Sequence, residues 1–209
     1  MLTVTQIIVI ITCLVSIPAF NRETIKENLL FWPYEINKRN QYYRFVSCGL
    51  IHADSMHLIF NMVSLYSFGV AIESFLFPVI FNQNTSILYV TLYVLGIIFS
   101  CIPDYFKYRE TYGYRALGAS GAVSAVIFSA ILLEPTMPLR FFFIPVDIPG
   151  YVFGLGFLGL SAYMSRRGGD NIGHNAHFWG GIFGLVFTFL AALSFTNINL
   201  FTRFIERVF

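Results

Sequence analysis

The chain has 209 residues, of which 56% are hydrophobic and 18% aromatic, while only 11% are charged. Soluble domains usually carry about a quarter charged residues, so this composition indicates an integral membrane protein. The formal net charge of +2 is too small to favour nucleic acid as a partner. Three widely spaced cysteines match neither a zinc site nor a disulfide framework.

Six segments are apolar enough to cross a bilayer, for which about 20 residues are needed. They lie at residues 2–20, 55–77, 86–103, 118–133, 148–164 and 174–194. Polar stretches separate them, and neither a repeat nor an attached soluble domain is visible. We therefore expect one membrane domain over residues 1–209, an all-α polytopic bundle of six transmembrane helices.

The first segment lacks the basic residues and the small-residue cleavage site of a secretion signal, so we interpret it as a retained helix. The long break that follows, residues 21–54, mixes charged residues with aromatics such as Trp32 and Tyr43. This mixture is typical of a loop that lies along the membrane interface. The tail at residues 195–209 has the same mixture, and we expect it at the interface as well.

The fourth segment is too short for a simple span. From Gly118 to Leu133 it has 16 residues, roughly 24 Å of helix against about 30 Å of hydrocarbon. If Glu134 lies at one interface, Ser120 lies roughly 10 Å below the opposite surface. Backbone at that depth is tolerated only where it is buried in protein or lines a cavity. The sequence thus predicts a water-filled recess with the Ser120 hydroxyl at its floor.

The four histidines form two clusters, His52 with His57 and His174 with His177. These clusters open the second and the sixth segment, and Ser120 opens the fourth. Even-numbered helices of a serial bundle run in the same direction, so their N-termini reach the same face of the membrane. The sequence therefore predicts that the histidines and Ser120 gather on one side.

Small residues follow Ser120 and His177 along their helices. Gly121 and Ala125 lie one turn apart in the fourth segment, and the sixth has a glycine stripe (Gly180, Gly181, Gly184). Small residues let membrane helices approach closely, so we expect these two helices to pack backbone to backbone. That contact would bring together Ser120 and His177, the minimum pair of a nucleophile and its base.

On the second segment, His57 and Asn61 are spaced i and i+4 and share one helix face. Their side chains are suitable donors to a developing oxyanion. Taken singly, a glycine stripe is more often a packing device, and a histidine near the membrane surface is often an interfacial contact. Polar groups at the same depth on three parallel helices instead favour a catalytic site.

Together these motifs resemble those of the rhomboid intramembrane serine proteases, in their minimal six-helix bacterial form. The matches are HxxxN (His57, Asn61), GxSG (Gly118, Ser120, Gly121) and AHxxG with a further glycine (Ala176, His177, Gly180, Gly184). Around them, Tyr43-Arg44 stands where the family has Trp-Arg, Glu73 where it often has a structural glutamate, and His52 where a histidine often precedes HxxxN. The resemblance covers the chain in order and spacing.

The resemblance implies a rhomboid-like bundle with a Ser120–His177 dyad and no third carboxylate. Ser120 would attack a peptide bond of a single-span membrane protein near the membrane surface, and His177 would take and return its proton. The backbone N–H groups of Ser120 and Ala119, with the His57 and Asn61 side chains, would hold the oxyanion. We expect no cofactor and no metal, and the partners would be transmembrane substrates and membrane lipid.

One departure concerns the surroundings of the histidine. Many relatives have an aromatic residue one turn after the serine, packed under the catalytic histidine, but this chain has Ser124 there. Another ring, for example Tyr66, Phe178 or Trp179, would have to hold the imidazole, and the sequence does not choose among them.

The fifth segment is rich in glycine and phenylalanine (Phe153, Gly154, Gly156, Phe157, Gly159). This composition suits a loosely packed helix past which a substrate enters from the lipid, and a purely structural role fits equally well. An unwound substrate is expected, because helical backbone hydrogen bonds shield the peptide bond.

Other intramembrane chemistries find less support. No HExxH run is present, and the aspartates lie at segment ends rather than facing each other in the membrane. Two alternatives stay open, a catalytically silent rhomboid-like protein that binds membrane helices and a small transporter. The presence of both Ser120 and His177 argues against the first, and polar groups confined to one side argue against the second.

The family expectation for location is the inner membrane of a bacterium, with the active site facing outward. That orientation leaves ten of the 13 Lys and Arg residues in outside loops. The positive-inside rule therefore favours the opposite orientation. We follow the family, because the first loop is expected to lie on the membrane.

Overall fold

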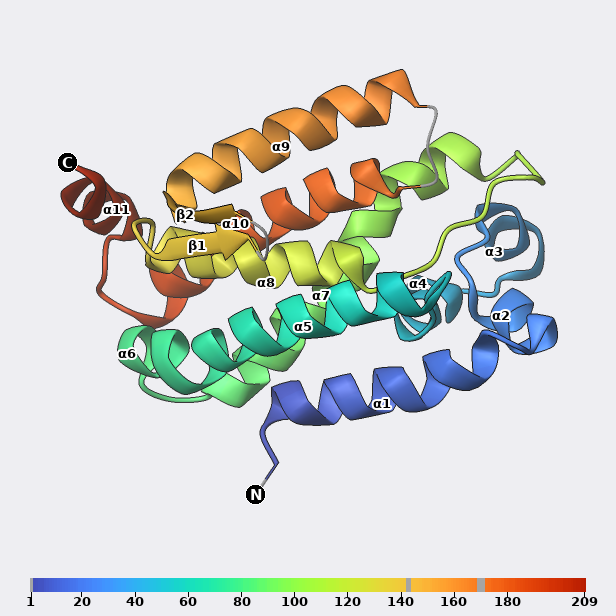
Figure 1. Cartoon of the computed structure of the whole chain (residues 1–209), viewed down its shortest axis with the longest axis horizontal. Helices are drawn as coiled ribbons and strands as arrows, with labels where there is room; N and C mark the ends of the chain where they lie inside the picture. The colour runs from blue at the N-terminus through green and yellow to red at the C-terminus, as the bar shows by residue number, and fades with distance from the viewer. Residues whose placement is uncertain (1, 142–143, 169–171) are drawn as a thin grey trace.

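The computed structural model describes residues 2–141, 144–168 and 172–209, which form a mostly helical bundle (Figure 1). The main helices are α1 (Val4–Ala19), α5 (Ser55–Ala71), α7 (Thr85–Tyr108), α8 (Ser120–Leu133), α9 (Gly150–Arg167) and α10 (His174–Phe195). Each coincides with one of the six predicted segments. Among the described residues, three helices are long and apolar enough to cross a membrane, Ser55–Phe81, Thr85–Tyr108 and His174–Phe195. The helices Val4–Ala19 and Ser120–Leu133 are apolar but shorter.

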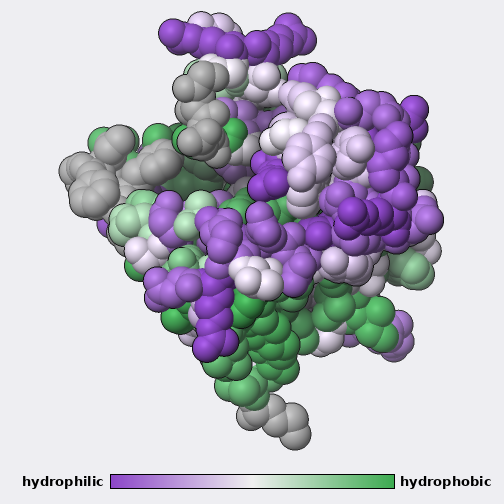
Figure 2. All heavy atoms as spheres, turned by 90° about the vertical axis from the view of Figure 1, so that its right-hand side faces the viewer, coloured by the Kyte–Doolittle hydropathy of each residue, from purple (hydrophilic) through white to green (hydrophobic). Residues whose placement is uncertain are grey.

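α8 lies at the centre of the bundle and contacts α5, α7, α9 and α10. Eleven of its 14 residues are buried, as expected for a helix that is apolar on every side. α5, α8 and α10 all begin toward the right-hand end of Figure 1, while α1, α7 and α9 run the other way. The prediction of three parallel N-termini is therefore confirmed. Figure 2 looks onto this end and shows hydrophilic residues gathered across it above hydrophobic ones.

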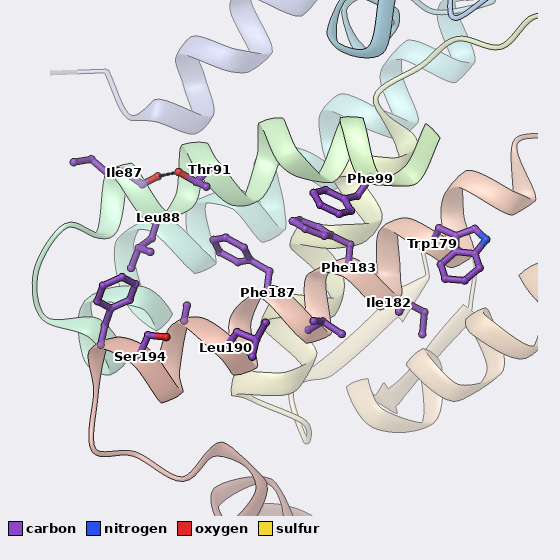
Figure 3. A pocket seen from close by; sticks show the side chains of 13 residues that line it. Ile87, Leu88, Thr91, Phe99, Trp179, Ile182, Phe183, Phe187, Leu190 and Ser194 are labelled. Atoms are coloured by element: carbon purple, nitrogen blue, oxygen red, sulfur yellow. Dashed lines mark hydrogen bonds between the residues drawn. The ribbon is translucent and has the colours of Figure 1, made fainter. Parts of the chain in front are cut away.

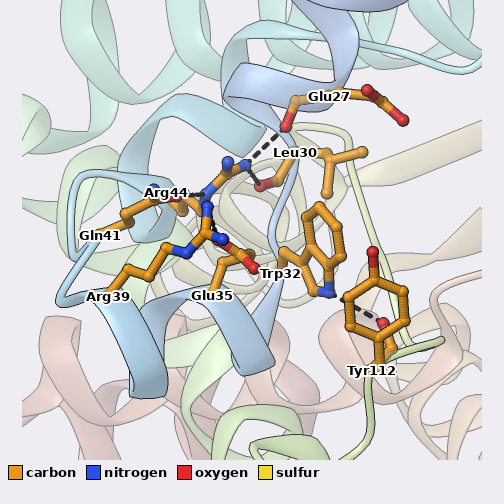
Figure 4. A network of polar contacts seen from close by, with 8 residues as sticks. All are labelled: Glu27, Leu30, Trp32, Glu35, Arg39, Gln41, Arg44 and Tyr112. Carbon is orange, nitrogen blue, oxygen red and sulfur yellow. Dashed lines mark hydrogen bonds and ion pairs between the residues drawn. The ribbon is translucent and has the colours of Figure 1, made fainter.

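The first loop folds into α2 (Glu23–Leu29), α3 (Pro33–Arg39), α4 (Arg44–Ser47) and the 3₁₀ turn η1 (Cys48–Leu50). Arg44 is almost fully buried within it. Its guanidinium donates to the carbonyl oxygens of Glu27 and Leu30, both at 2.8 Å, and to Gln41 Oε1 at 2.7 Å (Figure 4). It also lies over the Trp32 ring, 5.9 Å from the centroid. One charged group thus satisfies several backbone acceptors and makes the loop compact.

The same loop is joined to the segment that leads into α8. Phe31 and Ala116 exchange two backbone hydrogen bonds, of 2.8 and 3.0 Å. The Gly118 N–H donates to the carbonyl of Cys48 at 2.9 Å. The start of α8 is therefore positioned by residues far away in the sequence.

The second and third membrane helices run past the ends expected from hydrophobicity. The helix predicted at 55–77 continues through the π-helical turn η2 (Ile72–Leu76) into α6 (Phe77–Phe81). The helix predicted at 86–103 continues to Tyr108 through Pro103. Apolar composition marks only the part of a helix that faces lipid, whereas backbone hydrogen bonding carries the helix beyond it.

A small hairpin departs from the all-α prediction. β1 (Pro138–Phe141) pairs antiparallel with β2 (Ile144–Pro149), between α8 and α9. Arg140 lies opposite Asp147 and donates to both of its carboxylate oxygens, at 2.8 and 3.0 Å. The amphipathic helix α11 (Leu200–Val208) ends the chain.

Glu73, in the π-helical turn, caps the N-terminus of α1. Its carboxylate accepts from the backbone N–H groups of Val4 and Thr5, at 2.7 and 2.9 Å, and from the Thr5 hydroxyl at 2.8 Å. The first N–H groups of a helix have no intrahelical partner, and the helix dipole favours a negative charge there. Glu73 thus fastens α1 to the far end of α5.

We therefore expect Glu73→Ala to lower the free energy of unfolding by about 1–3 kcal/mol, because charged acceptors of backbone N–H groups contribute in this range. Reversible unfolding in detergent micelles measures the change. Glu206→Ala, which removes an exposed carboxylate of α11, is the matched control. Equal stability of the two variants would contradict the capping role.

Candidate active site

The turn before α8 requires a glycine. Gly118 has φ of +116°, a conformation that residues with a Cβ rarely adopt. A Cβ at this position would also lie 2.7 Å from Cε1 of His57, so the His57 ring is packed against the turn. The GxSG motif thus has a steric cause at its first residue.

The first turn of α8 presents free backbone donors. The first intrahelical bond of α8 runs from the Val123 N–H to the Ala119 carbonyl at 2.9 Å. The N–H groups of Ser120, Gly121 and Ala122 therefore lack intrahelical partners, as is general at helix starts. Such donors are suited to an oxyanion that forms beside Ser120.

α8 and α10 touch backbone to backbone. A Cβ at Gly180 would fall on the carbonyl oxygen of Gly121, and one at Gly184 would fall on that of Ala125. The small residues predicted to allow a close approach are therefore the ones at the contact. Further along the same two helices, the Thr188 hydroxyl donates to Ser129 Oγ at 2.6 Å in a buried position.

This contact positions the two predicted catalytic residues. Ser120 directly precedes Gly121, and His177 lies one turn before Gly180 on the facing helix. Both side chains are half-buried at the polar end of the bundle. Among the described residues, no hydrogen bond joins Ser120 Oγ to the His177 ring. Such catalytic contacts are often long without substrate and tighten in the reacting complex.

His57 and Asn61 lie on α5 beside this site, as their spacing predicts. Asn61 is buried, and its Nδ2 donates to the backbone carbonyl of His57 at 2.9 Å. The amide has a second N–H, which remains available as a donor. His57 packs on the Gly118 turn.

His52 accepts a hydrogen bond from one of the backbone N–H groups that we expected to hold the oxyanion. The Ala119 N–H donates to His52 Nε2 at 3.3 Å, so this ring nitrogen carries no proton. The proton is then on Nδ1, which lies 3.1 Å from Ser16 Oγ in α1. His52 is fully buried and meets the His57 ring edge to face at 4.9 Å. In this structure the Ala119 N–H is therefore committed to His52 and does not face an empty oxyanion position.

The ring beside His177 comes from α9. Phe157 lies 5.9 Å from the His177 ring, centroid to centroid, with a tilt of 31°. Of the three rings suggested by the sequence, Phe178 and Trp179 pack on each other, and Tyr66 is half exposed. The sequence interpretation missed Phe157, because it considered the phenylalanines of the fifth segment only as loose packing.

A buried carboxylate holds the first turn of α10. Asp104 accepts from Asn175 Nδ2 at 2.5 Å and from the Tyr114 hydroxyl at 2.6 Å. The Ser165 hydroxyl, at the end of α9, is 3.3 Å from Asn175 Oδ1. The sequence placed Asp104 outside the third helix, so this support for the residues next to His177 was not predicted.

Residues 39–194 match the model of the Rhomboid domain. The chain belongs to the rhomboid family. It is 28% identical over 173 residues to RHOMBOID-like protein 12, mitochondrial, of Arabidopsis thaliana, which covers 77% of this chain and 49% of that protein. It is 26% identical over 163 residues to rhomboid protease GlpG of Haemophilus influenzae, which covers 78% and 76% of the two chains. This chain thus spans about half the length of the plant relative, and the family consists of integral membrane proteins.

One apolar groove of this rhomboid lies away from the site. It has a volume of about 700 Å³ and runs along α7 and α10, lined by apolar side chains such as Phe99, Phe183 and Phe187 (Figure 3). Neither Ser120 nor His177 lines it. Its mostly apolar walls suit a flank that faces lipid.

We expect Gly180→Ala to destabilise the rhomboid fold and to slow any reaction at Ser120, because the added Cβ forces α10 away from α8. Overpacking of this kind typically costs about 1–3 kcal/mol. Gly159→Ala is the matched control, since the described part of the chain has no atom within 4 Å of that Cβ position. Thermal unfolding in micelles compares the two, and a Gly180→Ala protein as stable as the control would contradict the backbone contact.

Burial, reinforced by the neighbouring His57, lowers the pKa of His52 from 6.5 to about 3. The folded state therefore binds fewer protons at His52 than the unfolded chain, and the stability that this residue contributes is present above pH 6.5 and is lost as the pH falls toward 3. The loss amounts to at most about 1.4 kcal/mol per pH unit.

His52→Gln, which keeps an acceptor for the Ala119 N–H, should remove this share of the pH dependence. Unfolding free energies at pH 7, 5 and 4 in micelles test it. The same slope in both proteins would show that the pKa of His52 does not change on folding.

Proposed function

We propose that this chain is an intramembrane serine endopeptidase that cleaves single-span membrane proteins near the membrane surface through a Ser120–His177 dyad. The main observation behind this proposal is the contact of Gly121 with Gly180. It supports a close approach of the Ser120 and His177 side chains at the polar end of the bundle. Membership of a family that includes rhomboid protease GlpG supports the same chemistry.

In the proposed reaction, Ser120 Oγ attacks the scissile carbonyl carbon while His177 accepts the hydroxyl proton. The C–N bond then breaks as His177 gives this proton to the leaving amine, and an acyl ester remains on Ser120. A water molecule, deprotonated by His177, hydrolyses the ester and restores both residues. No third carboxylate takes part.

The oxyanion of each tetrahedral intermediate needs several donors. The free N–H of Ser120, the His57 ring and the second amide proton of Asn61 are the donors that we propose. The N–H of Ala119 would join them only after leaving His52, to which it is bonded in this structure.

We propose that a substrate reaches the dyad from the lipid past α9, in an extended conformation. Of the 18 residues of this helix, only Gly150, Gly154 and Ser161 are buried, which supports loose packing. The proposal includes six membrane-spanning helices, an interfacial first loop, and an active site on the outward side of a bacterial inner membrane.

A second candidate is a rhomboid-like protein that binds membrane helices without cutting them. The observation that favours it is the lack of a hydrogen bond between Ser120 and His177 in the described structure. The two functions differ in whether Ser120 is a reactive nucleophile.

A fluorophosphonate probe distinguishes the two candidates, because it modifies only an activated serine. We expect labelling at Ser120 of the detergent-solubilised protein and cleavage of a single-span membrane substrate. Ser120→Ala and His177→Ala should each abolish both signals, since removing either member of a serine–histidine pair removes most of the rate enhancement. Peptide mapping identifies the modified residue.

Ser124→Ala is the matched control, since it removes a hydroxyl one turn further along α8 and should keep both signals. Labelling or cleavage that persists in Ser120→Ala would exclude the dyad. A wild-type protein that binds the substrate but is neither labelled nor active would favour the silent binder.

A further inference from the structure

α9 is packed loosely against the bundle, yet it supplies an aromatic ring to the proposed site. Only Gly150, Gly154 and Ser161 of its residues are buried. Phe157 is nevertheless half-buried and has its ring 5.9 Å from that of His177. Phe157 therefore lies beside the His177 imidazole although few residues of its own helix are buried.

The described ring contacts of His177 come from α9 and from its own helix. On α8, the position one turn after Ser120 holds Ser124, which has no ring. Gly121 is in turn packed so closely on Ser100 that a side chain could not be added there. Among the described ring contacts, those of His177 are with Phe157 and with His174, at 5.9 and 6.0 Å. Phe157 is thus the described ring that reaches His177 from another helix.

Phe157 is itself held in place by aromatic neighbours. Its ring lies 5.9 Å from Phe128 of α8 and 5.6 Å from Phe153 of α9. Phe128 is fully buried, and its ring lies between Gly154 of α9 and Gly181 of α10, each of which would meet it if a Cβ were added. The line from Phe128 through Phe157 to His177 is therefore a continuous packed path.

We infer that Phe157 is a positioning residue that orients the His177 imidazole toward Ser120 from α9. This inference rests on the proposed protease function. It follows that the reactivity of Ser120 depends on where α9 lies, because the ring moves with that helix. In this chain the orientation of the base and the path of the substrate thus involve the same element.

Three variants test the inference in the full chain. Phe157→Ala removes the ring, Phe157→Tyr keeps it, and Tyr163→Ala removes an exposed ring elsewhere on the same helix. We expect Phe157→Ala to lower the rate of fluorophosphonate labelling and kcat by roughly tenfold, the preference that an aromatic contact supports. KM should change little, Phe157→Tyr should restore both rates, and Tyr163→Ala should keep them.

Other outcomes overturn the inference. A rise in KM at constant kcat would make Phe157 a substrate contact. Equal losses of rate and thermal stability in Phe157→Ala and Tyr163→Ala would make the effect a general one of α9, and an unchanged labelling rate in Phe157→Ala would remove any role. A wild-type protein without labelling at Ser120 would instead contradict the proposed function, so the two failures are distinguishable.

Discussion

The close approach of α8 to α10 is the constraint on which the rest of this structure depends. Glycine at 180 and 184 lets the carbonyl groups of Gly121 and Ala125 come against the facing backbone. In a membrane, helices gain little from apolar contact with each other, because lipid is equally apolar, so close packing and buried hydrogen bonds decide association. The Thr188–Ser129 hydrogen bond adds such an interaction. Everything proposed for Ser120 follows from this geometry.

The first loop provides the second constraint, since it holds the turn that begins α8. Cys48, Phe31 and His52 each bond to a backbone group between Ala116 and Ala119. Arg44 in turn keeps the loop compact by satisfying its carbonyl oxygens. The positive φ of Gly118 persists because this surrounding network determines the path of the backbone. A surface loop thus acts here as part of the scaffold of the site.

α9 is held less tightly than the α8–α10 pair and the first loop. It has few buried residues and open space at two glycines, but it supplies the ring that packs on His177. In the proposed site, Ser120 begins a buried helix, whereas the surroundings of His177 include a ring of the less buried α9. The Asn175–Ser165 contact links the far end of the same helix to the first turn of α10.

Apolar length and segment order by themselves determined the six helices and their alternating direction, and hence the common end at which α5, α8 and α10 begin, because exposure to lipid selects apolar residues over the length of each helix. Only the tertiary structure decided the long-range bonds. The pairing of Ala119 with His52, the cap that Glu73 places on α1, the support by Asp104 and the ring of Phe157 all join residues distant in sequence. No local pattern specifies such partners, since they depend on how whole helices and the first loop pack.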